Sequence, residues 1–347
     1  MSTKSWISII TLVLLGALIF LARNEIAAAW GLMDSVNFLI LFLLIPIQLA
    51  SYYAVGGMIF SYLKSKGDIK HLNHWETTRM ALELNFVNHI LPSGGAAGFS
   101  YLAWILGKHG VSAGRATMAQ VVRFFTSFTA FVFILMLCLV VLVFDHMINK
   151  VVLSISAIIA ITVIGGVIFA IYAISNHKRL IKFSAKITNF VNRVAKFFSR
   201  GKKKEILKLE KTEKFFTEMH EDYVEIKRDK KILVRPFIWA ILTNVFDVIL
   251  IFVAFWALGS YVNPATLFIA FGISSLAGVV SSIPGGAGVY ETVMIAFLAS
   301  SGVPADIAIA GTLLARVALL SGTVLFGYIF YQLTINKYGK VPTKPRI

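Results

Sequence analysis

Two arginines lie inside apolar stretches that are long enough to cross a membrane. Arg123 and Arg316 each occur roughly two turns into such a stretch, where a charged side chain is costly unless it is paired or functional. A guanidinium can donate two parallel hydrogen bonds to phosphate oxygens, so one interpretation is that both arginines bind a phosphate head group. The alternative is a structural ion pair with Asp247 or Glu291. Either interpretation points to recognition of charge inside the membrane.

Two breaks rich in glycine and proline interrupt other apolar regions. The first is Leu91–Gly98 and the second is Ile283–Gly288. Each break exposes backbone N–H groups at the start of a half-helix, and such groups favour anions. The glycines expected to contact a bound anion are Gly94, Gly95, Gly285 and Gly286. The other interpretation is that these glycines only let helices pack closely.

Further polar side chains lie beside the breaks or in the apolar stretch before the second one. Asn88 and His89 precede the first break, where they either line a cavity or satisfy backbone groups of the broken helix. Glu291 follows the second break and is expected either to couple proton movement or to cap the next helix. Asn244 and Asp247 are one turn apart, so both can face the interior of a helix bundle.

The sequence contains no recognisable set of residues for covalent, metal or nucleotide chemistry. No Walker sequence, HExxH, GxSxG or acidic metal-binding cluster occurs, and Cys138 is the single cysteine. We therefore expect no enzymatic activity and no cofactor. The formal net charge of +16 does not indicate nucleic-acid binding, because 18 of the 33 lysines and arginines fall between His177 and Arg235 without a nucleic-acid-binding motif.

The composition is that of a membrane protein. Hydrophobic residues make up 58% of the 347 residues, charged residues make up 14%, and the mean hydropathy is +0.79. Soluble chains carry about 25% charged residues. Several apolar stretches approach the roughly 20 residues that cross a bilayer. The expected spans are Trp6–Leu21, Val36–Leu63, Ala116–Phe144, Val151–Ile174, Pro236–Leu258 and Ile307–Leu333.

The distribution of lysine and arginine selects a topology. If each broken region enters and leaves on the same side, every basic cluster lies on the side of the N-terminus. These clusters are Lys64–Lys70, Lys108 with Arg115, the loop 177–235, and the tail after Lys337. A single crossing by the first broken region would place basic clusters on both sides. The positive-inside rule therefore favours two re-entrant hairpins, with both termini cytoplasmic.

The two broken regions also match each other at an offset near 192 residues. Pro92 corresponds to Pro284, Gly95 to Gly286, Gly110–Ala113 to Gly302–Ala305, and Arg123 to Arg316. The order in each half is a span, a broken hairpin, a small-residue turn and a span with one arginine. Within one membrane domain over 1–347, this predicts a first repeat at 36–144 and a second at 236–333. In the topology above the repeats are inverted, and the interface of such repeats is where transporters bind substrate.

The loop between the repeats, 177–235, contains a basic amphipathic helix that begins near Lys178. Apolar residues such as Leu180, Phe183 and Phe190 recur there at helical spacing, with lysines and arginines between them. This pattern is typical of a helix lying at a membrane surface. A connector on the inner leaflet is the first interpretation, and recruitment of a partner enzyme is the second.

At these motifs the chain resembles the transmembrane domain of lysylphosphatidylglycerol synthase/flippase proteins. The resemblance rests on Asn88–Gly95 and Pro284–Glu291, with Gly302 and Leu313–Arg316 in addition. It implies transfer of an amphiphilic lipid between leaflets. In the aminoacylating members a soluble synthase domain follows this domain. The present sequence ends just after its last apolar stretch, so we do not expect aminoacyl-transferase activity.

Together these patterns predict an all-α, polytopic membrane helical bundle with about six full spans and two re-entrant hairpins in an inverted repeat. The expected function is translocation of an anionic phospholipid or a polyprenyl-phosphate-linked lipid across a cytoplasmic membrane. The alternative is a non-transporting membrane subunit that stabilises or recruits a lipid-modifying enzyme or glycosyltransferase. Membrane lipids are the expected partners, nucleic acid is not, and homo-oligomerisation is left open.

Overall fold

The computed structural model describes residues 36–91, 96–145, 150–198, 207–281 and 286–339, together with the single positions 20, 23 and 27. The expected first span, 6–21, lies outside these residues except for Phe20, and so do Gly94, Gly95 and Gly285. The described part is almost entirely helical and has no strand. The expected all-α class is therefore confirmed.

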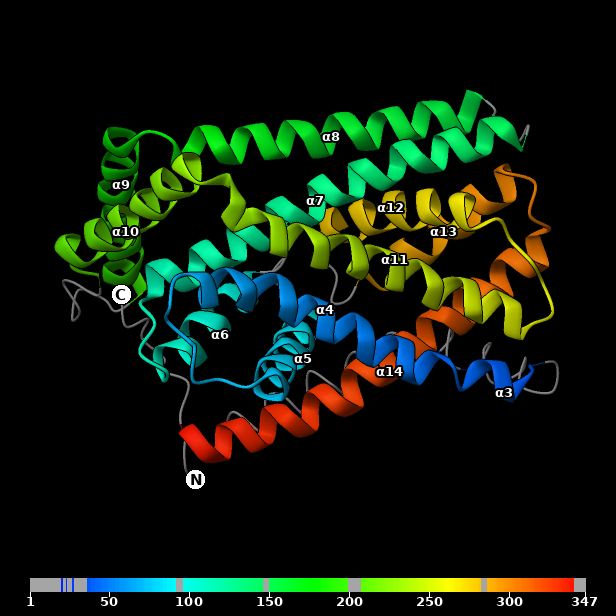
Figure 1. Cartoon of the computed structure of the whole chain (residues 1–347), viewed down its shortest axis with the longest axis horizontal. Helices are drawn as coiled ribbons and strands as arrows, with labels where there is room; N and C mark the ends of the chain where they lie inside the picture. Colours follow the sequence, from blue (N-terminus) through cyan, green and yellow to red (C-terminus); the bar gives the residue numbers. More distant parts are fainter. Residues whose placement is uncertain are drawn as a thin grey trace.

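Figure 1 shows the helices in chain order, with the long ones running along the length of the molecule. They are α3 (Phe38–Leu41), α4 (Leu44–Ser65), α5 (His74–Ile90), α6 (Ala96–Gly107), α7 (Ala113–Phe144), α8 (Lys150–Ile174), α9 (His177–Phe198), α10 (Leu209–Arg228), the 3-10 helix η2 (Lys230–Leu233), α11 (Val234–Ala257), α12 (Pro264–Ser281), α13 (Val289–Ser300) and α14 (Ala305–Tyr338).

Six segments of the described residues are long and apolar enough to cross a membrane. Five of them, which contain α4, α7, α8, α11 and α14, coincide with expected spans. The sixth is α12, the first arm of the second broken region. Helices α6 and α13 have 12 residues each, which is fewer than the roughly 20 needed to span a bilayer. The chain is therefore a multi-pass helical membrane bundle with broken helices.

The two broken regions fold as helix pairs that contact opposite halves of the chain. Helix α5 packs against α6 and also against α14, whereas α12 packs against α13 and also against α7. The second arms, α6 and α13, each pack on the long helix that follows them. Figure 1 shows α6 toward the end that carries α9 and α10, and α12 and α13 toward the other end. This exchange of contacts is the pattern that an inverted repeat would give.

The turns that leave the two pairs have the same backbone structure. Gly110 has φ of +83° and Gly302 has φ of +91°, a conformation that glycine adopts at low cost. The carbonyl of Leu106 accepts from the Val111 N–H at 3.1 Å, and the carbonyl of Leu298 accepts from the Val303 N–H at 3.0 Å. The correspondence of these segments in the sequence thus extends to individual hydrogen bonds.

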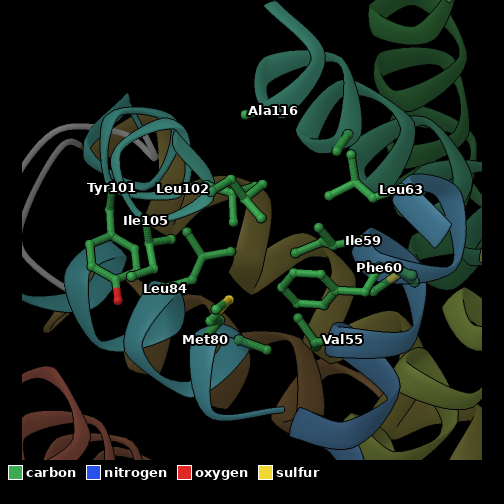
Figure 2. Packing of buried hydrophobic residues seen from close by; sticks show 14 of the residues in the cluster. Val55, Ile59, Phe60, Leu63, Met80, Leu84, Tyr101, Leu102, Ile105 and Ala116 are labelled. Carbon is green, nitrogen blue, oxygen red and sulfur yellow. The ribbon is translucent and has the colours of Figure 1, made fainter. Parts of the chain in front are cut away.

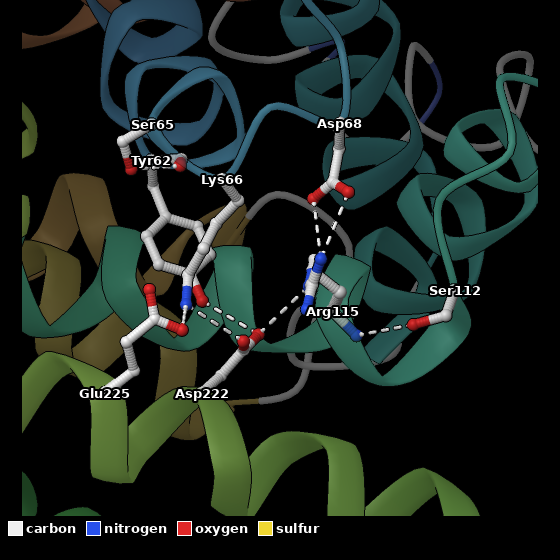
Figure 3. A network of polar contacts seen from close by, with 8 residues as sticks. All are labelled: Tyr62, Ser65, Lys66, Asp68, Ser112, Arg115, Asp222 and Glu225. Atoms are coloured by element: carbon white, nitrogen blue, oxygen red, sulfur yellow. Dashed lines mark hydrogen bonds and ion pairs between the residues drawn. The ribbon is translucent and has the colours of Figure 1, made fainter.

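One end of the bundle gathers the basic segments of the chain. Figure 3 shows Asp222 of α10 between Lys66, which follows α4, and Arg115 of α7. Its carboxylate lies 3.1 Å from the Lys66 ammonium and 3.6 Å from the Arg115 Nε, and it accepts from the Tyr62 hydroxyl at 2.8 Å. Arg115 also pairs with Asp68 at 3.1 Å. Helix α10 is therefore fastened to the end of α4 and to α7 by a network of charges.

Helix α9 packs on α10, which changes the expected role of its apolar stripe. Leu180 is 4% exposed, and Ser184 and Thr188 on the same side are also buried. Phe183 and Phe190 are 50% and 67% exposed. Only part of the stripe is therefore available to a membrane surface, because the rest is covered by protein.

Apolar side chains form two main clusters, one beside each helix pair. The first joins α4, α5, α6 and the start of α7, and Figure 2 shows Ile59, Leu84 and Leu102 meeting within it. The second joins the later part of α7 with α8, α11, α12 and α13. Long helices α7, α11 and α14 contribute to both clusters. Their middle sections therefore lie between two apolar cores.

Glu83 ties α5 to α14 inside the first cluster. It is 0% exposed, accepts from the Thr334 hydroxyl at 2.6 Å and from the Tyr101 hydroxyl, and pairs with Arg79 at 3.3 Å. The sequence did not single out Glu83, because its partners Arg79, Tyr101 and Thr334 lie on three different helices, α5, α6 and α14.

Replacement of Glu83 by alanine is expected to lower the free energy of unfolding by about 2–3 kcal/mol. The reason is that the hydroxyls of Thr334 and Tyr101 and the guanidinium of Arg79 would lose their acceptor. Glu83→Gln, which keeps an acceptor oxygen, should cost less. Thermal unfolding of the purified variants in detergent measures both effects, and equal melting temperatures for wild type and Glu83→Ala would contradict this role.

Candidate functional site

A layer of polar side chains separates the two apolar clusters. On α11, Asn244 and Asp247 lie between Ala240 of the first cluster and Val248 of the second. On α14, Arg316 directly follows Ala315 of the second cluster. On α7, Arg123 follows Val122 of the first cluster and joins the layer through its hydrogen bond to Asn85 of α5. The fold therefore brings together residues that are far apart in the sequence.

Arg316 forms the shortest ion pair of this layer with Glu291. Its Nε lies 2.6 Å from Glu291 Oε1, and the guanidinium carbon lies 4.8 Å from the centre of the Tyr290 ring. Glu291 Oε2 accepts from the Gly288 N–H at 2.7 Å, which closes the N-terminus of α13. Glu291 therefore has both of its expected structural roles: it caps α13 and it pairs with Arg316. Asp247 is not the acid that pairs with Arg316.

Arg123 has a different environment. Its guanidinium donates to the amide oxygens of Asn85 and Gln120, both at 3.4 Å. Among the described residues it makes no ion pair within 4 Å. The side chain is half-buried. A cation held by neutral amides at long hydrogen-bond distances keeps the capacity to bind an anion.

His89 lies in the last turn of α5, next to the first break. Its Nδ1 is 2.8 Å from the Asn85 carbonyl, so Nδ1 carries a proton and donates it, which leaves Nε2 for another partner. Asn85 accepts from His89 through its backbone carbonyl and from Arg123 of α7 through its side-chain amide oxygen. The end of α5 therefore contacts α7 within the polar layer.

Asp247 and Asn244 of α11 make hydrogen bonds with the neighbouring helices α4 and α7. The Ser51 hydroxyl of α4 donates to Asp247 Oδ1 at 2.8 Å. The Asn244 amide donates to the Ala240 carbonyl at 2.9 Å and to the Ser127 carbonyl at 3.4 Å. Asn244 is buried, whereas Asp247 is half-buried. Asn244 therefore acts mainly on backbone, and Asp247 supplies a carboxylate to the layer.

Asn88 occupies a space that a glycine provides. A Cβ atom on Gly98 of α6 would lie 2.3 Å from Asn88 Oδ1, so only glycine leaves room for this amide. The same oxygen is buried and has no hydrogen-bond partner among the described residues. An acceptor in that state is costly, and it requires a donor from a ligand, from water or from the neighbouring break.

Gly286 and Gly288 shape the second break. They have φ of +69° and +81°, a region that residues with a side chain rarely adopt. A Cβ on Gly286 would lie 3.0 Å from Gly278 Cα on α12, whereas nothing lies within 4 Å of one on Gly288. Of the two expected uses of Gly286, the structure shows the approach to a facing helix.

Sequence reasoning missed several members of the layer. Ser51, Gln120 and Tyr290 hold the expected residues in place, yet each is common in apolar helices and has no distinctive spacing. Gln48 and Tyr52, by contrast, were recognisable in the sequence as polar side chains in an apolar stretch. They join α4 to α14, with the Gln48 amide 2.9 Å from the Leu319 carbonyl and the Tyr52 hydroxyl hydrogen-bonded to that of Thr323. Gly94, Gly95 and Gly285 lie outside the described residues, so their expected contacts stay predictions.

Comparison with known proteins gives the family of the fold. Residues 5–327 match the family described as "Lysylphosphatidylglycerol synthase TM region". This range includes both helix pairs and every residue of the polar layer named above.

Two archaeal proteins are similar to the chain over most of its length. The "UPF0104 membrane protein MJ1595" of Methanocaldococcus jannaschii is 27% identical over 248 residues, which are 70% of each chain. A "UPF0104 membrane protein" of Methanothermobacter thermautotrophicus is 25% identical over 238 residues, which are 67% of each chain. Their names describe membrane proteins and state no activity.

Proposed function

Because the chain belongs to the lysylphosphatidylglycerol synthase transmembrane-region family, we propose that it moves an anionic lipid between the two leaflets of a membrane. The observation that carries this proposal is the guanidinium of Arg123, which lies in a helix long and apolar enough to cross a membrane, donates to the neutral amide oxygens of Asn85 and Gln120, and makes no ion pair among the described residues. A phosphate beside this side chain would meet a guanidinium that can donate a pair of hydrogen bonds.

The polar layer is suited to a head group that binds and then leaves. Arg316 is held by Glu291 and provides a fixed positive charge, whereas Arg123 has only neutral amides within hydrogen-bond distance. Glu291 and Asp247 reduce the net positive charge of the layer. Binding of an anion is therefore favourable without being so strong that release is prevented.

In this proposal the helix pairs are the gates. The pair α5–α6 closes the layer toward the end that bears α9 and α10, and the pair α12–α13 closes it toward the other end. Opening of one pair at a time exposes the head group to one leaflet, as expected for transporters built from inverted repeats. The lipid is an anionic phospholipid or a polyprenyl phosphate, because both present a phosphate on an apolar chain.

The direct test uses proteoliposomes that contain this chain alone. Fluorescent phosphatidylglycerol, phosphatidylcholine and a polyprenyl phosphate are placed in both leaflets, and the fraction open to an external quencher is followed with time. We expect faster exchange of the anionic lipids than in protein-free vesicles. Exchange that matches protein-free vesicles for all three probes would refute the proposal.

Arg123→Ala is expected to reduce exchange of anionic lipid at least about 100-fold while the protein stays folded. The hydrogen bonds that we propose the guanidinium donates to phosphate would be lost. The fold should tolerate the change, because the partners of Arg123 among the described residues are the neutral amides of Asn85 and Gln120 and no carboxylate loses an ion pair. Arg123→Lys keeps the charge but lacks the planar guanidinium that donates two parallel hydrogen bonds, so it should recover only part of the rate of lipid exchange. Full exchange by Arg123→Ala would remove this residue from the binding site.

The inverted arrangement has a separate test in the turns that follow the two pairs. We expect single cysteines at His109 and Ser301, in a Cys138→Ala background, to react with an impermeant maleimide from opposite sides of the membrane. His109 should lie on the cytoplasmic side, together with both termini and the loop 177–235, because the basic segments gather there. Labelling of both cysteines from one side would rule out inverted repeats.

A second candidate function is that of a subunit that recruits a lipid-modifying enzyme or a glycosyltransferase. The attachment of α10 to α4 and α7 through Asp222 favours it, since this holds the α9–α10 pair as a firm platform. The proteoliposome test separates the two candidates. A recruiting subunit would give no lipid exchange when it is the sole protein present.

A further inference from the structure

A pocket of about 340 Å³ lies apart from the polar layer, between α4 and the first turns of α5 and α11. Neither arginine of the layer lines it, and neither does His89. Its lining is a mixture of aromatic, small and basic residues: Tyr53, Gly56, Gly57, Phe60, Ser61, Lys64, His74, Thr77, Arg235, Ile238 and Trp239. The volume is within the range of small-molecule binding sites.

The pocket collects positive charge without a compensating acid. Lys64 is in the last turn of α4, Arg235 is in the first turn of α11, and His74 begins α5. The described lining residues include no carboxylate, and Lys64 and Arg235 make no ion pair with any described residue. Two cations that share a pocket repel each other, and an anion between them would remove that repulsion.

A buried hydroxyl in the same pocket has an unused hydrogen bond. Ser61 Oγ is inaccessible to solvent and has no hydrogen-bond partner among the described residues. Serine in a helix usually donates to a backbone carbonyl of the preceding turn, as Ser65 does to Tyr62 at 2.7 Å. Ser61 is four residues before Ser65 and three before Lys64, so it belongs to the same stretch of α4. A phosphate oxygen is the kind of acceptor that would satisfy it.

The wall of the pocket is built from rings and opens on the outer surface of the bundle. A Cβ on Gly57 would lie 2.4 Å from Trp239 Cδ2, so this glycine lets the indole lie against α4. The Trp239 ring meets Tyr53 edge-on at 5.4 Å. Tyr53 and Ile238 remain exposed, at 39% and 52%, on helices that cross the membrane. The rim therefore offers an apolar surface that hydrocarbon chains can cover.

We infer that this pocket binds one anionic phospholipid from the leaflet next to the basic end of the bundle. The phosphate lies between Lys64 and Arg235 and accepts from Ser61, and the acyl chains run along Tyr53 and Ile238. A lipid fits better than a soluble phosphate, because much of the lining is aromatic or aliphatic and the rim faces hydrocarbon. This site does not depend on the proposed lipid exchange, since it shares no residue with the polar layer.

The test measures quenching of Trp239 in detergent-solubilised protein. Phosphatidylglycerol or phosphatidylcholine with brominated acyl chains is added, and the signal of Trp239 is obtained as the difference between wild type and Trp239→Phe. We expect the phosphatidylglycerol to quench at lower concentration than the phosphatidylcholine. Lys64→Gln with Arg235→Gln should weaken this quenching at least roughly tenfold, the size expected for two lost cation–lipid contacts.

Two further variants distinguish the effect of charge in the pocket from the effect of the room available for a lipid. Ser61→Leu should fill the pocket and weaken quenching without a change of charge, whereas Lys70→Gln, at an exposed lysine outside the pocket, should have no effect. Arg123→Ala should also leave quenching unchanged, so failure of this site and failure of the proposed function are distinguishable. Equal quenching by both lipids that the double variant leaves unaltered would overturn the inference. Full competition by sn-glycerol 3-phosphate would assign the pocket to a soluble phosphate instead.

Discussion

Replacement of Arg316 by alanine is expected to lower the free energy of unfolding by about 3–5 kcal/mol, the cost of leaving a buried carboxylate without its partner. Glu291 is 4% exposed, and its Oε1 is 2.6 Å from Arg316 Nε. Loss of the guanidinium would also disturb α13, because Glu291 closes the N-terminus of that helix through Gly288. Thermal unfolding of the purified variant in detergent measures the effect.

A second substitution should rescue much of this loss. Glu291→Gln in the Arg316→Ala background removes the unpaired charge but keeps an oxygen that can accept from the Gly288 N–H. We expect the double variant to be more stable than Arg316→Ala by about 1–3 kcal/mol, which is the range of coupling between residues in contact. Arg193→Ala, at an exposed residue of α9, is the matched control and should change stability by less than about 0.5 kcal/mol.

The rescued protein gives the decisive comparison. If Arg316 serves only the ion pair, the double variant should exchange lipid as well as wild type does. If Arg316 also binds the head group, the double variant should be folded and inactive. An unchanged melting temperature for Arg316→Ala would show that the ion pair contributes nothing to the fold.

Gly286→Val is expected to abolish lipid exchange and to destabilise the second helix pair by about 3 kcal/mol or more. The backbone at Gly286 has φ of +69°, which is strongly unfavourable for a β-branched residue. In addition, the new Cβ would lie 3.0 Å from Gly278 Cα, so α12 and α13 would have to separate. Both effects act at the break through which we expect the layer to open.

Two other glycines provide controls that separate the cost of the positive φ from the cost of the close contact with α12. Gly288→Ala carries the strain of a positive φ, +81°, without a close neighbour, and should cost about 1–2 kcal/mol. Gly166→Val in α8 has neither feature and should be mild. Melting temperatures and exchange rates of the three variants are compared side by side. Wild-type exchange by Gly286→Val would exclude close approach of α12 and α13 as a requirement of the mechanism.

The two helix pairs use small residues in different ways. In the first pair, Gly98 makes room for the Asn88 amide, so a polar group is admitted into the interface. In the second pair, Gly286 meets Gly278, so two backbones come close. The alternative interpretation from the sequence, that these glycines serve packing, therefore accounts for part of what is observed. The unpartnered Asn88 oxygen is the feature that packing leaves unexplained.

The sequence by itself determined the class of the protein, the positions of most spans and the two breaks. These properties follow from local composition: hydrophobic length defines a span, and glycine with proline interrupts a helix. It also singled out Arg123 and Arg316, because a charge is conspicuous in an apolar stretch. The matching turns at Gly110 and Gly302 were visible for the same reason, since a local backbone requirement selects the residue.

The partners of those residues were decided by the tertiary structure alone. The sequence offered Asp247 and Glu291 equally as acids for Arg316, and the packing of α13 on α14 selects Glu291. Likewise, Arg123 meets the Asn85 amide because α5 crosses near α7, 38 positions away in the chain. Helical spacing tells which residues share a face, but the direction in which that face points depends on how helices cross. For that reason the sequence predicted which residues make up the polar layer, but it did not predict which of them contact each other.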